Sequence, residues 1–248
     1  EEPCISGTRG SGAIFFSGCT LRCCFCQNYS ISSATYGKEI SEQKLARIFL
    51  ELQNQGAHNI NLVTATQYLP SILNALDLVK NQLEIPVVYN SSGYEKPETI
   101  RLLKGYVDIY LPDLKYFSSE LSRKYSKAED YFEVASCAIK LMIEQTGTPV
   151  FDSDGMLQKG VIVRHLVLPN CRKDSISLLH WLKETLPDKH YLISLLSQYT
   201  PFYNSHKYPE LNRRITTYEY ESILKEAISL GLVEGFMQEK SSAKEEYT

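Results

Sequence analysis

Short apolar segments alternate with amphipathic ones along most of the chain, and this alternation predicts the fold. Apolar runs that favour buried strands occupy 13–16, 59–63, 85–89, 107–111, 161–168 and 191–196. Between them, apolar residues recur at helical spacing, which predicts helices over 41–56, 70–79, 97–103, 131–147, 175–182 and 216–231. Such strands suit burial on both faces, so the pattern predicts a parallel sheet wrapped by helices.

Several element boundaries carry specific local signals. Ser41 is a suitable helix N-cap, and Thr216 opens a capping box with the glutamate three residues later. Pro70 and Pro97 suit first helical turns, because proline lacks the N–H that a first turn leaves unpaired. The segment 151–155 contains an Asp-Gly pair and predicts a turn.

Polar residues follow the apolar core of each predicted strand. They are Cys19, Thr64, Asn90, Asp113, Asn170 and Gln198. A barrel and an open doubly wound sheet both fit the strand count, and in both the functional site lies at the carboxyl ends of the strands. The sequence therefore predicts one site at that edge, with the aperiodic loop 198–209 as its cover.

The cysteine loop after the first strand carries the most specific chemistry. Cys19, Cys23 and Cys26 form a C-x3-C-x2-C pattern, and three thiolates in eight residues can hold an iron–sulfur cluster with one iron left open. A single zinc ion would need a fourth ligand, and the nearest histidine is His58. Cys24 is expected to pack beside the cluster.

Composition narrows the class of protein. The chain has 248 residues, 43% hydrophobic content and a net charge of −3, which predicts no general attraction to nucleic acid. No apolar run approaches the ~18–20 residues of a membrane helix, and no signal peptide is visible. Seven cysteines, four of them in one loop, favour free thiols and a cytoplasmic location over a disulfide framework. We expect one domain over 1–239 with a flexible tail over 240–248; the absence of an initial Met indicates a trimmed or partial product.

Two neighbouring residues in the strand at 161–168 point to opposite faces. Arg164 is flanked by apolar residues, so its charge needs a partner. His165 suits a surface or helix-packing position, with a role in the site as the alternative.

The segment 19–28 resembles the radical S-adenosylmethionine (SAM) superfamily, and within it the activating enzyme of pyruvate formate-lyase. The resemblance extends over nearly the whole chain, through the segments 60–66, 89–94, 112–115 and 163–169. It implies a partial (β/α)6 TIM-type barrel of parallel strands with a [4Fe-4S] cluster. Three cysteines would bind three irons, and SAM would chelate the fourth. An electron from reduced flavodoxin or ferredoxin would cleave SAM, and the 5′-deoxyadenosyl radical would abstract a hydrogen from the substrate.

The resemblance also implies roles for individual residues, with no catalytic side chain beyond the cluster ligands. Phe25 would lie near adenine, and Thr64 and Thr66 fall where the family has a Gly-Gly-Glu segment that receives the SAM amino group. The other implied contacts to SAM are Asn90, Asp113, Lys115, Arg164 and Gln198, the last with Tyr199. The family glutamate is absent, so neutral groups must take the SAM ammonium.

The leading hypothesis is thus a radical SAM enzyme acting on a protein or peptide, with activation of a glycyl radical enzyme as its most specific form. The alternatives are a small-molecule substrate, a non-catalytic metal-binding or interaction module on the same barrel, and a zinc-dependent hydrolase. The family's Asp-Gly-Pro-Gly segment is replaced by residues 5–12, which weakens the assignment of a substrate.

Overall fold

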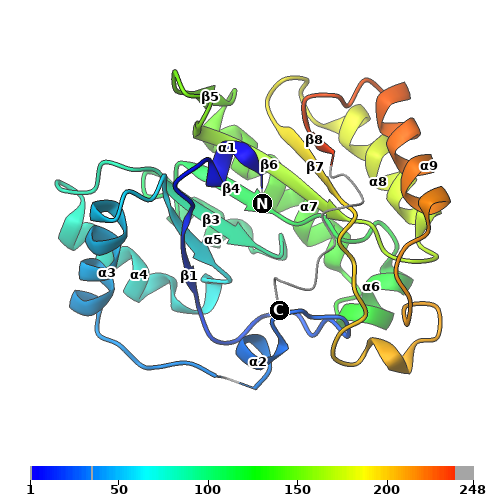
Figure 1. Ribbon diagram of the computed structural model, residues 1–248, viewed down its shortest axis with the longest axis horizontal. Helices are drawn as coiled ribbons and strands as arrows, with labels where there is room; N and C mark the ends of the chain where they lie inside the picture. Colours follow the sequence, from blue (N-terminus) through cyan, green and yellow to red (C-terminus); the bar gives the residue numbers. More distant parts are fainter. Residues whose placement is uncertain (1, 35, 238–248) are drawn as a thin grey trace.

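In the described part of the chain, seven parallel strands form one sheet, in an order that follows the sequence. The computed structural model describes residues 2–34 and 36–237. The sheet order is β1 (Gly12–Phe15), β2 (Ile60–Val63), β3 (Val87–Ser91), β4 (Ile109–Pro112), β6 (Leu157–Leu166), β7 (Leu192–Leu196) and β8 (Gly235–Met237). A doubly wound sheet would reverse its strand order, and this one never does. The fold is therefore a singly wound partial barrel of the TIM type (Figure 1).

The sequence predicted six of these strands. The seventh, β8, pairs with β7 through Gly235 and Ile193. A short strand β5 (Val150–Phe151) pairs antiparallel with β6, across the turn predicted at 151–155. Strand β6 also starts four residues before the predicted 161, because it continues through this hairpin. The tail predicted at 240–248 lies outside the described residues.

Helices cover the outer face of the sheet, as the periodicity predicted (Figure 1). The main ones are α3 (Glu42–Asn54), α4 (Leu69–Val79), α5 (Pro97–Leu102), α7 (Tyr131–Thr146), α8 (Arg172–Thr185) and α9 (Thr217–Ser229). The sequence did not predict α6 (Ser119–Ser126) or the short helices α1 (Pro3–Ser6), α2 (Tyr29–Ser32), η1 (Thr66–Tyr68) and η2 (Ser205–Lys207). In the part of the chain that is described, no helix is both long and apolar enough to cross a bilayer.

The predicted helix signals are confirmed. Ser41 accepts a hydrogen bond from Lys44 N, and Thr216 forms the complete capping box with Glu219. Pro70 lies in the first turn of α4. These local contacts fix where helices begin, and hence where the loops at the edge of the sheet run.

A small apolar cluster fills the inside of the curved sheet at the end where the strands begin. Helix α1 contributes Cys4 and Ile5, and Asn59 Nδ2, just before β2, donates to Ile5 O at 2.8 Å. The strand residues of this cluster are Val88, Ile109, Leu111, Leu157, Ile162 and Leu192. Because this end is filled by apolar side chains, polar inward-facing residues gather at the carboxyl ends of the strands.

Candidate metal and cofactor site

The cysteine loop follows β1 and is anchored on both sides by main-chain hydrogen bonds. Cys24 N donates to Tyr125 O at 2.8 Å in α6, and Asn204 N, in the loop after β7, donates to Cys24 O at 2.8 Å. Cys24 is buried, whereas Cys19, Cys23 and Cys26 are half-buried. The loop therefore presents three thiols at the carboxyl edge of the sheet, with Cys24 packed behind them as expected.

The surroundings of the thiols fit a metal centre with several metal ions. Burial raises the pKa of Cys23 to about 11 and also raises that of Cys19, while Lys115 opposes both shifts. Ser126 Oγ donates to Cys23 Sγ at 3.0 Å. In the described ranges, no three His, Cys, Asp or Glu side chains converge on one position as the ligands of a single metal ion would. In an iron–sulfur cluster each cysteine sulfur binds a different iron, so the three thiols need not converge on one position.

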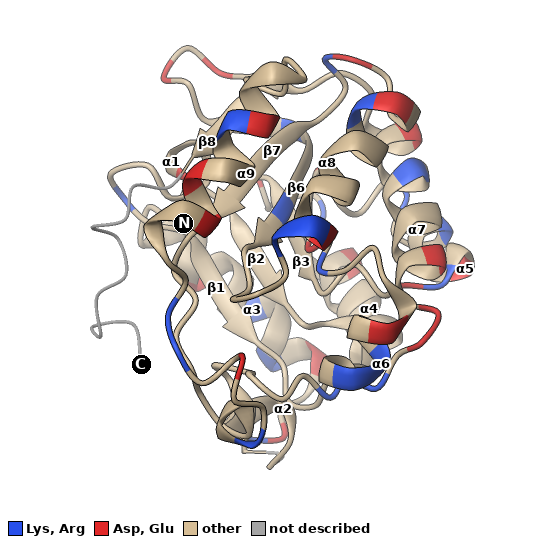
Figure 2. Cartoon of the chain, turned by 90° about the vertical axis from the view of Figure 1, so that its right-hand side faces the viewer, with Lys and Arg blue, Asp and Glu red and all other residues tan. Residues whose placement is uncertain are grey.

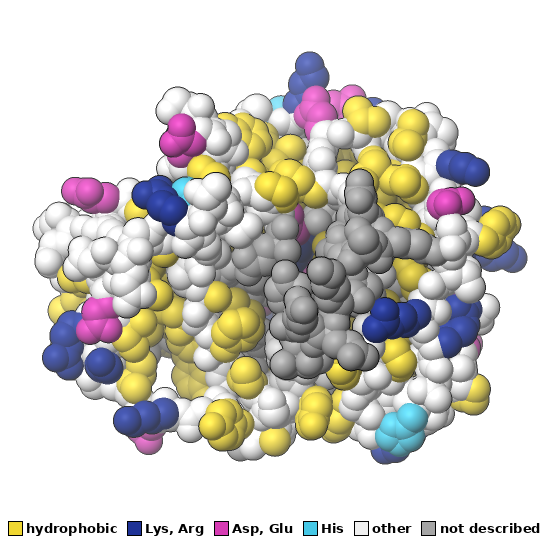
Figure 3. Space-filling model, in the orientation of Figure 1, with side chains coloured by type: hydrophobic (Ala, Val, Ile, Leu, Met, Phe, Trp, Pro, Cys, Tyr) yellow, Lys and Arg dark blue, Asp and Glu magenta, His cyan; other side chains and the backbone are white. Residues whose placement is uncertain are grey.

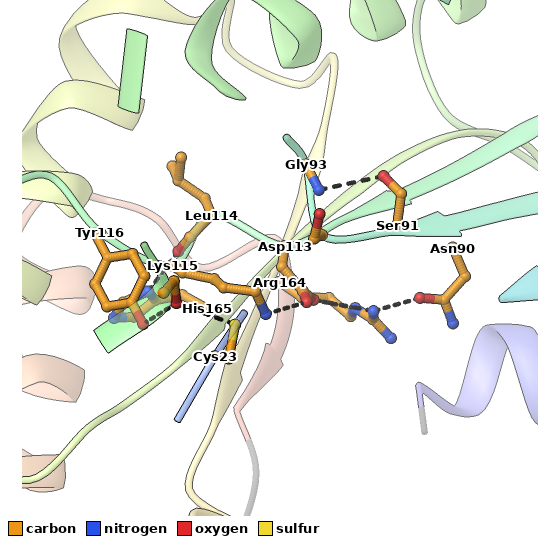
Figure 4. Close-up of polar contacts among 12 residues, drawn as sticks. Cys23, Asn90, Ser91, Gly93, Asp113, Leu114, Lys115, Tyr116, Arg164 and His165 are labelled. Carbon is orange, nitrogen blue, oxygen red and sulfur yellow. Dashed lines mark hydrogen bonds and ion pairs between the residues drawn. The ribbon is translucent and has the colours of Figure 1, made fainter. Parts of the chain in front are cut away.

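Next to the thiols lies a network of charged and polar side chains, shown in Figure 4. Asp113 Oδ1 accepts from Arg164 Nη2 at 2.9 Å, and Asp113 Oδ2 accepts from Lys115 Nζ at 2.5 Å. Arg164 Nη2 also donates to Asn90 Oδ1 at 2.5 Å. Only 16–22% of each charged side chain is exposed. We call Asn90, Asp113, Lys115 and Arg164 the strand-end network.

Sheet register explains why these four residues meet. Asp113 follows β4 and forms a parallel bridge with Arg164 of β6. Asn90 belongs to β3 and pairs with Leu111, two residues before Asp113, so both point inward from neighbouring strands. Of the residues predicted at the carboxyl edge, Asn90 and Asp113 belong to this network; Lys115 and Arg164, which the resemblance indicated, complete it.

Charge balance keeps the network ionised. Burial alone would raise the pKa of Asp113, but Lys115 and then Arg164 outweigh it, so this pKa lies below its usual value. The pKa of Lys115 is raised, because Asp113 and then Cys23 more than offset its burial. Lys115 therefore links the network electrostatically to the thiols. A site with an anion, two cations and an amide suits a zwitterionic ligand.

The remaining predicted contacts lie around this centre in different ways. Phe25 is buried and makes an edge contact with Tyr199, with ring centroids 5.8 Å apart. Thr64 N donates to Asn90 O at 2.9 Å, which places its backbone beside the network. The hydroxyl of Thr66 instead donates to Glu95 Oε1 at 2.7 Å. Gln198 is exposed after β7, so its contact with SAM, like that of Thr66, stays a prediction.

Two polar residues beside the site were not predicted. Glu95 is 1% exposed, and burial raises its pKa to about 7. Its Oε2 atom has no hydrogen-bond partner within the described part of the chain. Gln67 bonds to the residues before Cys19. Neither residue stands at a strand end or in a motif, and the only available signal for Gln67 is its place directly after Thr66.

His165 is a packing residue, as its position in the strand suggested. Its Nδ1–H donates to Leu114 O at 2.7 Å, and Nε2 lies 2.8 Å from Ser175 Oγ in α8. Burial lowers its pKa to about 4, so the ring is neutral. His165 therefore fastens α8 to the sheet, on the face away from the network.

The fold and the site define the class of protein: a partial α/β barrel with a three-thiol metal loop and a charged network at one end. A family model described as the radical SAM superfamily matches residues 13–153. Because this match covers more than half of the 248 residues, the chain belongs to the radical SAM superfamily. Membership implies a [4Fe-4S] cluster and SAM, and the three half-buried thiols and the charged network fit these two groups.

Three similar proteins show how much of a longer chain this sequence matches. An uncharacterised protein of Methanocaldococcus jannaschii is 33% identical over 226 residues, 86% of this chain and 61% of the relative. Streptococcus suis SuiB bound to S-adenosylmethionine superposes with a TM-score of 0.63 and 14% identity, over 94% of this chain and 52% of SuiB. Methylornithine synthase superposes at 0.59 with 15% identity, over 89% of this chain and 61% of the synthase. This chain thus spans about three fifths or less of each of these proteins, and the two structures show the shared fold.

Proposed function

We propose that this chain cleaves SAM reductively and uses the resulting radical to abstract a hydrogen from a protein or peptide. The single observation that carries the proposal is the place of Lys115 between the strand-end network and two of the three thiols. Lys115 bonds to Asp113 and acts electrostatically on both Cys19 and Cys23. The charge of Lys115 thus acts both on the cysteine loop and on the strand-end network. A cluster that binds SAM requires its metal ligands and the groups that bind SAM to lie next to each other in this way.

The side chains divide the work as follows. Cys19, Cys23 and Cys26 would hold three irons, and Lys115 and Arg164 would bind the SAM carboxylate. When bound, the cluster and SAM supply one-electron reduction and a carbon radical. The sheet and its inner apolar cluster keep water from the floor of the site, which protects reactive species. Reduced flavodoxin or ferredoxin is the proposed electron donor, and the cytoplasm, where thiols stay reduced, is the proposed location.

Exposed aromatic residues beside the cluster loop support a protein or peptide substrate. Phe15, Tyr29 and Tyr68 are 51%, 45% and 43% exposed, and Tyr29 stacks on Tyr203 with centroids 5.0 Å apart. Hydrophobic side chains gather on this face below β1 and near α2 (Figure 3). Acidic and basic positions are mixed on the outer helices α6 and α9 (Figure 2). An aromatic rim suits a protein partner better than a polyanion.

The fold neighbours support the substrate class only in part. One SuiB structure is described as bound to the precursor peptide SuiA, and it superposes on this chain with a TM-score of 0.60. Methylornithine synthase, however, has the same fold, which makes a small molecule the second candidate. Activation of a glycyl radical enzyme rests on the resemblance of the sequence motifs, so we keep it as the most specific form of the proposal.

Anaerobic reconstitution tests the chemistry. The wild-type chain should bind about four irons and, once reduced, convert SAM to 5′-deoxyadenosine. Cys23→Ser should lose both properties. Cys4→Ser, at a buried thiol in the apolar cluster where the strands begin, is the matched control and should keep them. An intact cluster that binds SAM without cleaving it would contradict the enzyme assignment. Binding of zinc in place of iron would favour the hydrolase hypothesis.

The substrate needs a separate test. Candidate partner proteins encoded near the gene should be incubated with the reduced enzyme and SAM, and examined by electron paramagnetic resonance (EPR) for a glycyl radical. Faster SAM cleavage without a protein radical would favour a peptide or small-molecule substrate.

A further inference from the structure

One exposed side chain connects the loop after β2 to the start of the cluster loop. The amide Nε2 of Gln67 lies 2.7 Å from Ser17 O, 3.0 Å from Gly18 O and 3.0 Å from Thr64 O. Two amide hydrogens are thus shared among three carbonyl groups. Ser17 and Gly18 directly precede Cys19, so this contact joins the first cluster ligand to the segment that follows β2.

The segment that Gln67 holds is strained. Thr64 has φ 58°, in the left-handed region where β-branched residues are genuine outliers. Such a conformation persists only where the surroundings enforce it. Here Thr64 N donates to Asn90 O at 2.9 Å, and Thr64 O accepts from Gln67. On the helix side, Thr66 is fixed by its hydrogen bond to Glu95.

Stability alone does not account for these contacts. Gln67 is exposed, so water can replace its hydrogen bonds at a modest cost in unfolding free energy. A glutamine with similar contacts occurs away from the site: Gln53 Nε2 donates to Gln82 O at 2.9 Å, and its Oε1 accepts from Glu84 N at 2.7 Å. Gln53 joins two outer segments, whereas Gln67 joins two segments that border the cofactor site.

We propose that Gln67 is a positioning residue that holds the backbone of Thr64 at a fixed place relative to the cluster loop. This inference rests on the proposed function, because the fixed place matters only if the cluster and the segment 64–66 bind one SAM molecule together. Gln67 touches neither group in this assignment. It acts through the carbonyl groups of Ser17, Gly18 and Thr64.

Two variants at Gln67 and one control test the proposal. Gln67→Leu removes the donor, and Gln67→Glu turns an acceptor toward three carbonyl oxygens. Gln53→Leu removes the comparable outer contact. For each chain we would measure thermal unfolding without metal, iron content, the EPR spectrum of the reduced cluster, and the change in that spectrum on titration with SAM.

The two Gln67 variants should bind iron normally, unfold within about 4 °C of the wild type and show an unchanged spectrum without SAM. Their Kd for SAM should rise at least about tenfold, whereas Gln53→Leu should match the wild type. Wild-type affinity in both Gln67 variants would overturn the positioning role and leave the proposed function standing. Loss of iron or of folding in these variants would also overturn it, by showing a structural role. A wild-type chain that binds iron but not SAM would overturn the proposed function and the positioning role together.

Discussion

Asp113→Asn is the most informative single change in the strand-end network. It keeps the shape of the side chain but leaves Lys115 and Arg164 side by side without the carboxylate that both of them contact. Removing one partner of a fully buried ion pair costs about 3–5 kcal/mol, whereas exposed pairs contribute about 1 kcal/mol or less. With 16–22% of each side chain exposed, we expect a loss of about 3 kcal/mol.

Urea unfolding of the metal-free chain at pH 7 measures this loss. Combined with Arg164→Met in a double-mutant cycle, Asp113→Asn should show a coupling of about 1–3 kcal/mol. The pKa of Asp113 is lowered in the folded chain from 3.8. Its stabilisation is therefore present above that value and is lost as the pH falls through the folded pKa. The difference between wild type and Asp113→Asn should shrink below about pH 4.

An exposed ion pair provides the control. Asp188 contacts Lys183 at 2.9 Å, but its side chain is 70% exposed, so Asp188→Asn should cost less than about 0.5 kcal/mol. If Asp113→Asn is equally mild and the cycle is additive, the network is solvated in the same way as a surface pair. That result would refute the argument that the strand-end network is shielded from water and suits a zwitterionic ligand.

Three further predictions concern the groups around the site. The pKa of His165 falls from 6.5 to about 4 on folding, so the stabilisation by the neutral ring is fully present above pH 6.5 and is lost as the pH falls toward 4. Urea unfolding should show that the wild type loses about 2 kcal/mol of unfolding free energy between pH 7 and pH 5, and that His165→Gln lacks this loss. The pKa of Glu95 rises from 4.5 to about 7 on folding, so its stabilisation is present below pH 4.5 and is lost as the pH rises through 7. About 2 kcal/mol of unfolding free energy should be lost from pH 5 to pH 7, and Glu95→Gln should remove this loss. The two effects offset each other in the wild type, so each variant must be compared with it; parallel pH profiles would contradict either pKa argument. Ile5, in the apolar cluster where the strands begin, is 1% exposed, so Ile5→Ala should cost about 2–4 kcal/mol of unfolding free energy by the same method. Ile228→Ala, at a position 53% exposed, should cost less than about 1 kcal/mol. Equal costs would refute the packing of α1 into the barrel.

The sequence pattern predicted the elements whose signals are local. Apolar runs located six parallel strands, and residues such as Ser41 and Thr216 located helix starts. Helix α6 was missed because Ser119–Ser126 carries only two sizeable apolar side chains, too few for a recognisable stripe. Strand β8 has three residues and depends on pairing with β7, which no local pattern reveals.

The residues of the candidate site likewise fall into those that the sequence pattern could predict and those that it could not. The three cysteines lie within eight residues, so their grouping was visible directly. Asn90 and Asp113 could be placed because parallel strands end at one edge, whereas Lys115 and Arg164 were indicated by the resemblance. The structure brings all four together. Gln67 and Glu95 could not be placed, because their partners lie 50 and 29 residues away in the sequence and no strand register links them.

The strain at Thr64 connects the altered motif to the structure. Where this chain has Thr64-Ala65-Thr66, the resemblance placed a Gly-Gly-Glu segment, and glycine adopts positive φ without strain. Thr64 keeps φ 58° although its side chain opposes that conformation. The contacts of Gln67 and Glu95 hold this backbone shape in place. The segment lacks the acidic side chain, so the proposed contact of residues 64–66 with SAM would go through neutral groups, of which the main-chain groups are held at a fixed place by these contacts.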